Sequence, residues 1–199
     1  MNVKEQIKEY KRERILEAAA KLFYEKGFQK TTIDDIGAAL GVTKPFIYTY
    51  FENKYAILEQ LFDVVYGDLH ADVMKVLSSK DGSPKDRLRR FVTVYVEKNI
   101  ERQRFTAIML EEEKNLSAKK IADIRRKQRD FDGKLARLIE EGVSDGLFEV
   151  PDAKVASLAI SGMVRWTHRW YSPEGRLSAS QLSTNMADLA LNLVGCAQR

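Results

Sequence analysis

Residues 31–54 constrain the fold of this chain more than any other stretch, because they read as two short helices joined by a tight turn. Thr32, followed three residues later by Asp35, has the pattern of a capping box, in which each residue bonds the backbone of the other at a helix start. Gly41 then supplies the turn that two steeply crossing helices require. Three apolar residues recur at helical spacing and predict one buried stripe: Ile33, Ile36 and Leu40.

The second helix of the pair has a start signal and two distinct faces. Thr43 is a residue type that caps helices, and Pro45 falls in the first turn, where a missing N–H costs little. Ile47 and Phe51 are four residues apart, so they share a face that we expect to pack inward. Three side chains are left to point outward: Lys44, Tyr48 and Tyr50. A helix presented in this way is typical of proteins that read the DNA major groove.

The pattern TT-x-DD-I, G-V-T and I-Y-x-Y-F-x-N-K resembles the DNA-binding domain of the TetR family of transcriptional regulators. The resemblance implies an all-α fold: a three-helix helix-turn-helix head over residues 1–54 and a helical ligand-binding and dimerisation domain over residues 55–199. The alternative is a small helical bundle whose capping pattern arose by coincidence.

The family resemblance also implies which side chains meet DNA. Those expected at phosphates, together with the capping Thr32, are Thr31, Thr43, Tyr48, Tyr50 and Lys54. Those expected at base edges are Lys44, Pro45 and Phe46, of which Lys44 can donate to guanine and Phe46 can touch a thymine methyl group. Phe46 has the alternative of packing internally.

Composition adds less than the motif does. The chain has 199 residues and a formal net charge of +4, divided equally between residues 1–54 and the remainder, so no basic block marks a nucleic-acid partner. Cys196 is the single cysteine, which suits a reducing cytoplasm. We expect a cytoplasmic protein without membrane contact, because no signal-peptide core and no membrane-length apolar run is visible.

Caps and breakers predict about nine helices. FVTVYV at 91–96 is the best β candidate, but it lies within a helical pattern opened by Ser83 and Pro84, so we predict a helix there. The predicted helices after the two-helix motif cover about 53–78, 85–101, 105–115, 118–143, 153–171 and 179 to near the C-terminus, and the first covers about 3–26.

The last two helices are the expected source of a homodimer, since small residues on one and apolar residues on the other permit close approach. The residues expected at this interface are Val155, Ala159, Gly162, Leu182, Met186, Leu189 and Leu193. The alternative is that they form ordinary core stripes.

Residues 162–194 resemble the C-terminal helices of TetR regulators that respond to acyl-CoA thioesters. Arg165 and Arg169 share one face, and Trp166 and Trp170 share the next, which suits a ligand with phosphates and an adenine ring. Alternatively the tryptophans are core and the arginines are solvated or paired with acidic residues. A pool of apolar lining residues completes the expected site: Phe91, Tyr95, Phe105, Ile108, Met109, Phe131 and Met163.

These patterns predict a regulator, most simply a repressor, that binds palindromic operator DNA as a dimer and is released by an apolar or acyl-CoA effector. Two alternatives remain: a multidrug-sensing repressor of an efflux pump, and a structural DNA-binding protein without an effector. An enzyme is not expected, because the two histidines, His70 and His168, lie far apart in sequence and no metal-spaced cluster or phosphate loop occurs. We expect no catalytic residues, no metal site and no cofactor.

Overall fold

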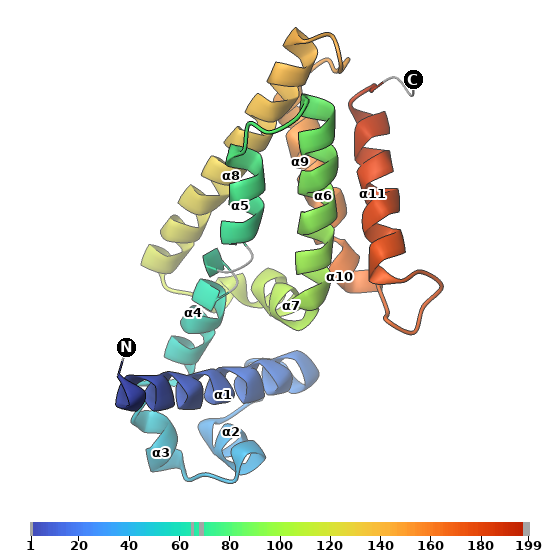
Figure 1. Ribbon diagram of the computed structural model, residues 1–199. Coiled ribbons are helices and arrows are strands. Elements are labelled where there is room, and N and C mark those ends of the chain that lie inside the picture. Colours follow the sequence, from blue (N-terminus) through green and yellow to red (C-terminus); the bar gives the residue numbers. More distant parts are fainter. Residues whose placement is uncertain (1, 65, 68–69, 197–199) are drawn as a thin grey trace. The chain divides into compact units, whose positions relative to one another are not determined.

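Helices account for all regular structure in the part of the chain that the structure describes, as the sequence predicts (Figure 1). The computed structural model describes residues 2–64, 66–67 and 70–196, with the side chain of His70 outside the description. None of the helices in these ranges combines the length and the apolar composition that a membrane span needs. The chain divides into two compact units, Met1–Val65 with Arg104–Ile121, and Tyr66–Gln103 with Ala122–Arg199.

The first unit contains the predicted helix pair. Its helices are α1 (Val3–Lys26), α2 (Ile33–Leu40), α3 (Lys44–Tyr48) and α4 (Lys54–Val64), together with most of α7 (Gln103–Glu112) and the short 3-10 helix Glu113–Asn115. Phe28, between α1 and α2, is fully buried, with Phe23 edge-on at 5.0 Å and Tyr55 at 5.2 Å between ring centroids. This apolar centre fixes α1, the turn after it and the start of α4 against one another.

The second unit is a set of helices packed around one apolar core. It contains α5 (His70–Ser78), α6 (Pro84–Glu101), most of α8 (Ala118–Ser144), α9 (Ala153–Arg165), α10 (Thr167–Trp170) and α11 (Ala179–Leu193). Figure 1 shows α6 and α11 running side by side, and their contact is the most extensive between any two helices. The expected helix across residues 91–96 is confirmed as part of α6, whose start has the predicted serine cap and first-turn proline.

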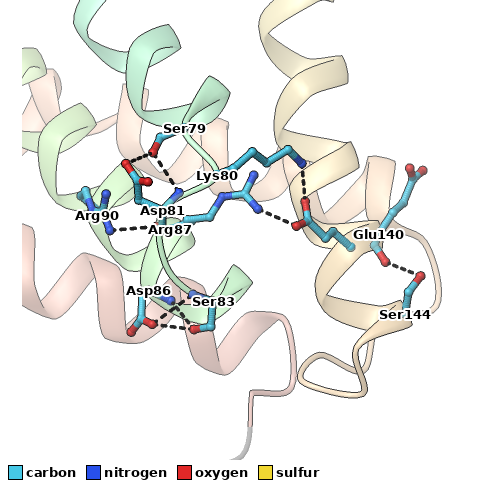
Figure 2. Close-up of polar contacts among 10 residues, drawn as sticks. Ser79, Lys80, Asp81, Ser83, Asp86, Arg87, Arg90, Glu140 and Ser144 are labelled. Atoms are coloured by element: carbon cyan, nitrogen blue, oxygen red, sulfur yellow. Dashed lines mark hydrogen bonds and ion pairs between the residues drawn. The ribbon is translucent and has the colours of Figure 1, made fainter.

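A polar network closes the loop between α5 and α6 (Figure 2). Ser83 and Asp86 form a capping box at the start of α6. The Arg87 guanidinium, only 3% exposed, donates to Glu141 on α8 at 2.7 Å, and Lys80 reaches the same carboxylate at 3.1 Å. Both contacts, Arg87 first, lower the pKa of the Glu141 carboxyl. The network therefore ties this loop to the end of α8.

The predicted helix over about 153–171 is interrupted, because α9 ends at Arg165 and α10 begins at Thr167. Two side chains take the carbonyl of Val164 from the helical ladder: Asn99 donates to it at 3.0 Å and the Thr167 hydroxyl at 2.8 Å. Insertion of a side chain into the ladder is a known cause of helix breaks. The predicted helix over 53–78 corresponds to α4 and α5, and its continuity across positions 65, 68 and 69 lies outside the described residues.

Candidate functional sites

The start of α2 has the capping box that the sequence predicts. The backbone N–H of Asp35 donates to the Thr32 hydroxyl at 3.1 Å, and the backbone N–H of Thr32 donates to the Asp35 carboxylate at 2.8 Å. The Thr32 hydroxyl also donates to that carboxylate, at 2.6 Å. Hydrogen bonds from the side chain and then the backbone of Thr32 hold the pKa of Asp35 below its ordinary value. The turn that follows therefore begins from a fixed helix.

Two glycines shape the turn between α2 and α3. Gly41 ends α2 in the left-handed conformation, with φ +66° and ψ 29°, which favours glycine. Gly37 is required for a different reason: a Cβ atom there would lie 2.8 Å from the carbonyl oxygen of Val42. The sequence pattern indicates the first glycine but not the second, because close approach between a helix and the turn that follows it leaves no pattern in the sequence.

Helix α3 packs its apolar face inward and leaves its first turn exposed. Ile47 is fully buried and Phe51 is 4% exposed, as predicted. Thr43 occupies the N-cap position, but its hydroxyl makes no capping hydrogen bond, so among the described residues it is a free polar group at the surface. Tyr48 is 47% exposed.

The other side chains of α3, and Tyr50 just after it, make contacts at or near the surface of the unit. Lys44 forms an ion pair with Asp34 at 2.8 Å, which raises the Lys44 pKa, and both side chains are exposed. Phe46 and Tyr50 are half-buried with ring centroids 5.2 Å apart, and Lys11 lies over the Phe46 ring. Pro45 is exposed beside them. The exposed face of α3 thus offers hydroxyl, ammonium and aromatic groups within a few residues.

Thr31 and Lys54 hold the scaffold together instead of lying on its surface. Thr31 is 0% exposed, and its hydroxyl is placed against the carbonyls of Leu22 at 3.2 Å and Gly27 at 2.9 Å. The Lys54 ammonium donates to three carbonyls of the α1–α2 connection at 2.6, 3.3 and 2.9 Å, and burial lowers its pKa. Both groups are engaged within the unit in the absence of DNA, and their contact with phosphates stays a prediction.

In the second unit, three of the expected lining residues meet in the interior. Phe91 and Tyr95 on α6 and Phe131 on α8 are buried, with ring centroids 5.3–5.7 Å apart. Met163 is half-buried and packs against the same core. The other three expected residues lie on α7 in the first unit, where Ile108 is buried, Met109 is half-buried and Phe105 borders an open groove of about 530 Å³.

A polar group that the sequence analysis missed lies against this aromatic cluster. Ser161 on α9 is 0% exposed, and Asp132 on α8 is half-buried. Among the described residues, Oγ of Ser161 and Oδ1 of Asp132 are buried atoms without a hydrogen-bond partner. Burial raises the pKa of Asp132, and Arg165 opposes that rise by its charge, as does the nearby Ser161 hydroxyl. Neither residue belongs to a sequence motif, so only the tertiary structure could reveal them.

The arginine and tryptophan segment does not gather inside the unit. Trp166 is 59% exposed and Trp170 is 51% exposed, and the Arg169 guanidinium lies 5.8 Å from the Trp166 ring centroid. Arg165 alone faces inward, half-buried, and donates from Nε to the Ser161 carbonyl at 3.3 Å. The tryptophans therefore lie at the surface of the unit, and their contact with a ligand stays a prediction.

The residues expected at a dimer interface divide into two groups. Val155, Ala159 and Gly162 on α9 are exposed, as are Leu189 and Leu193 on α11. Leu158, which the sequence analysis did not name, continues the α9 stripe with 45% exposure. Leu182 and Met186 are 3% and 4% exposed and lie in the core of the unit, so they are not surface residues.

A capped helix pair with an exposed second helix, followed by a separate helical unit, defines a helix-turn-helix regulator. Residues 15–61 match the family described as bacterial regulatory proteins, tetR family, and residues 81–194 match the tetracyclin repressor-like C-terminal domain. The chain therefore belongs to the TetR family of transcriptional regulators.

Individual relatives agree with this assignment. The chain is 28% identical to the HTH-type transcriptional repressor KstR2 of Mycolicibacterium smegmatis, over 94% of this chain and 91% of the relative. It superposes with a TM-score of 0.82 on the TetR family regulator PfmR from Thermus thermophilus, at 32% identity, over 94% of this chain and all of the other. With AibR in complex with isovaleryl coenzyme A and operator DNA, the TM-score is 0.73 at 25% identity, covering 89% and 96%.

Proposed function

We propose that this regulator is a repressor that binds palindromic operator DNA as a homodimer and is released when a small apolar or acyl-CoA effector binds the second unit. The observation that carries the proposal is the exposed face of α3, presented on the capped and glycine-turned scaffold of α2. The similarity to KstR2, which is a transcriptional repressor, supports repression as the function. The similarity to AibR, which binds isovaleryl coenzyme A and operator DNA, supports an acyl-CoA effector. The DNA-binding domain is taken to end near residue 54.

The DNA contacts proposed are those that the exposed face of α3 and its flanks offer. Tyr48, Tyr50 and the threonines at the two helix starts contact phosphates, which fix orientation without reading sequence. Lys44 and Phe46, with Pro45 between them, lie at base edges, where Lys44 exchanges its ion pair with Asp34 for a guanine. Few long polar side chains lie on this face, so DNA shape contributes to the choice of site.

The dimer is proposed to form through α9 and α11. A palindrome requires two heads about 34–36 Å apart or a multiple of that distance. The exposed apolar and small residues of α9 fall at positions 155, 158, 159 and 162, which is one face of a helix, and two leucines of α11 are exposed as well. An exposed apolar stripe on a helix is the kind of surface that a symmetric partner covers.

Release from DNA follows from differential binding. An effector can shift the equilibrium only by binding the conformation that does not bind DNA more tightly than the one that does. The aromatic cluster of Phe91, Tyr95 and Phe131 offers an apolar lining in the second unit, and Arg165 is the inward-facing cation beside it. An acyl chain in this interior would meet apolar walls, with Arg165 and Asp132 beside them.

A preformed operator complex tests the proposal. CoA esters of short, branched, long and aromatic acids are added, alongside the free acids and a set of cationic drugs, and the complex is followed by gel shift. Release by CoA esters alone supports the proposal. Release by cations alone favours the multidrug-sensing alternative, and release by neither, with no ligand raising the melting temperature, favours a DNA-binding protein without an effector.

A further inference from the structure

The interior of the second unit holds hydrogen-bonding capacity that the described residues do not use. Oγ of Ser161 and Oδ1 of Asp132 are buried, and neither makes a hydrogen bond of normal distance and angle among the described residues. The two side chains are nevertheless close enough that the Ser161 hydroxyl lowers the pKa of Asp132 as a hydrogen-bond donor would. Buried polar atoms in folded proteins are almost always paired, so an unpaired one calls for an explanation.

The neighbouring polar residues show that the fold itself does not cause the deficit. Ser157 lies one turn before Ser161 on α9, is equally buried, and donates its hydroxyl to the Lys154 carbonyl at 2.8 Å. Asn99, 1% exposed, donates to the Val164 carbonyl and to the Thr167 hydroxyl. Nε of Arg87 on α6 is also buried without a partner, but its guanidinium is paired with Glu141 through another nitrogen. Ser161 and Asp132 differ from Ser157 and Asn99, because each of the two has a buried oxygen without a partner among the described residues and both lie in the same group.

The surroundings indicate what would satisfy these atoms. Asp132 offers an acceptor, and Ser161 offers a donor as well as an acceptor. Tyr95 and Arg165 are close enough to exert charge effects in the same group, and the rings of Phe91, Tyr95 and Phe131 supply apolar surface beside it. Arg165 and Asp132 carry opposite charges in the same group, so a ligand needs no net charge at this point. A neutral group that both donates and accepts fits best.

We propose that Asp132 and Ser161 form the polar end of the effector site and bind a neutral hydroxyl group carried on the apolar part of the effector. The hydroxyl donates to Oδ1 of Asp132 and accepts from the Ser161 hydroxyl. This assignment rests on the effector control proposed above, and it narrows the effector from any apolar or acyl compound to a hydroxylated one.

Matched ligands test the assignment by isothermal titration. The probes are butanoyl-, octanoyl- and dodecanoyl-CoA, each compared with its terminally hydroxylated and terminally aminated counterpart, and phenylacetyl-CoA compared with 4-hydroxyphenylacetyl-CoA. For at least one pair, the wild-type protein is expected to bind the hydroxylated member roughly tenfold more tightly, since a hydrogen bond to a charged group has about that effect. The preference should disappear in Ser161→Ala and in Asp132→Leu.

Ser157→Ala is the matched control, because it removes an equally buried hydroxyl that has a structural partner. It should retain the preference for the hydroxylated probe while lowering Tm by about 2–4 °C. Ser161→Ala should leave the Tm of the ligand-free protein unchanged or raised, since the hydroxyl it removes is unpaired. A fall in Tm for Ser161→Ala equal to that for Ser157→Ala would overturn the assignment without any ligand.

The remaining outcomes separate this assignment from the proposed function. Probes that release operator DNA without a hydroxyl preference overturn the hydroxyl site and leave effector control standing. A preference for the aminated probes overturns it in favour of a cation site. If no probe binds and none releases operator DNA, effector control by these compounds fails and the hydroxyl site fails with it.

Discussion

Two aspartates, one in each unit, show opposite uses of the same side chain. Asp35 in the first unit receives hydrogen bonds from Thr32 and lies near Lys26, and its pKa is lowered. Asp132 in the second unit is half-buried with an unpartnered oxygen among the described residues, and its pKa is raised by burial. Asp35 thus stabilises the start of its own helix, whereas Asp132 keeps one oxygen without a partner among the described residues.

The tyrosines repeat the contrast. Tyr48 on α3 is 47% exposed, whereas Tyr95 on α6 is 5% exposed and its phenol pKa is raised by burial. A surface that reads DNA needs exposed groups on a rigid frame, and a site that admits a small molecule needs interior groups that the frame leaves unpaired. The first site can therefore be recognised from a sequence pattern, whereas the second becomes visible only in the packed structure.

The largest expected effect tests whether the second unit pairs two DNA-reading heads. Leu158→Glu places a charge in the exposed stripe of α9 and should separate the proposed dimer, because a buried unpaired charge is costly. Loss of the linked second head should lower operator affinity by about 10²–10⁴-fold, measured by gel shift with sedimentation of the free protein. Leu147→Glu, at a leucine of similar exposure outside α9 and α11, should bind normally. A Leu158→Glu dimer with full affinity would contradict the interface.

The next effect tests the exposed tyrosine of the first unit. Tyr48→Phe removes only the hydroxyl proposed to bond a phosphate, so affinity should fall roughly ten- to a hundredfold. The fall should be similar for operator and for unrelated DNA, because phosphate contacts carry no sequence information. Tyr24→Phe on α1, at a tyrosine that is 50% exposed, is the control and should change nothing. An unchanged affinity for Tyr48→Phe would remove it from the interface.

A pair of helical glycines should respond in opposite directions to the same change. Gly37→Ala in α2 forces a Cβ to within 2.8 Å of a backbone oxygen, so unfolding free energy should fall by about 1–3 kcal/mol. Gly133→Ala in α8 meets nothing within 4 Å and should raise it by about 0.5–1 kcal/mol. Denaturant titration measures both. Equal effects would show that the turn between α2 and α3 yields more readily than its geometry implies.

The smallest effect tests the two aspartates by their pH dependence. Asp35 has a lowered pKa, so its stabilisation is present above its ordinary value of 3.8 and is lost as pH falls through the lowered value. Asp35→Asn should lower Tm by about 1–4 °C near neutral pH, and the difference should vanish in acid.

Asp132 has a raised pKa, so its ionisation costs stability as pH rises from 3.8 to the raised value and the cost is constant above it. Asp132→Asn should therefore raise Tm by about 1–3 °C near neutral pH, despite the loss of the Arg165 charge contact, and should have no effect in acid. Thermal unfolding across pH measures both variants. Profiles of the same sign would contradict the comparison.

The helix pair could be predicted from sequence because its determinants are local. Thr32 and Asp35 are three residues apart, and Gly41 acts on the turn in which it lies. Thr31 and Lys54 have structural contacts that the pattern does not indicate: the Thr31 hydroxyl lies against the carbonyls of Leu22 and Gly27, and Lys54 donates to the carbonyl of Phe28. A pattern that resembles a DNA-contacting one does not show which polar groups are already committed.

In the second unit, helical spacing predicted that Leu182 and Met186 share a face of α11, but not that this face turns inward, since both are buried. The spacing failed for Arg165 and Arg169, because the helix is interrupted between them and only Arg165 is half-buried. Packing decides the rest, since many helices compete for the same core. Ser161 shows the limit most clearly, because the lack of a partner for its hydroxyl among the described residues depends on how the helices pack and not on its neighbours in sequence.

The ammonium of Lys54 gives the first unit a mechanical property. Lys54 begins α4 and is tied to three carbonyls that follow α1, with its charge 4.3 Å from the Phe28 ring centroid. A rotation or translation of the first turn of α4 therefore either breaks these hydrogen bonds or moves the segment that leads into α2 with it. A displacement of α4 would therefore move α2 and α3 together with it as one rigid body.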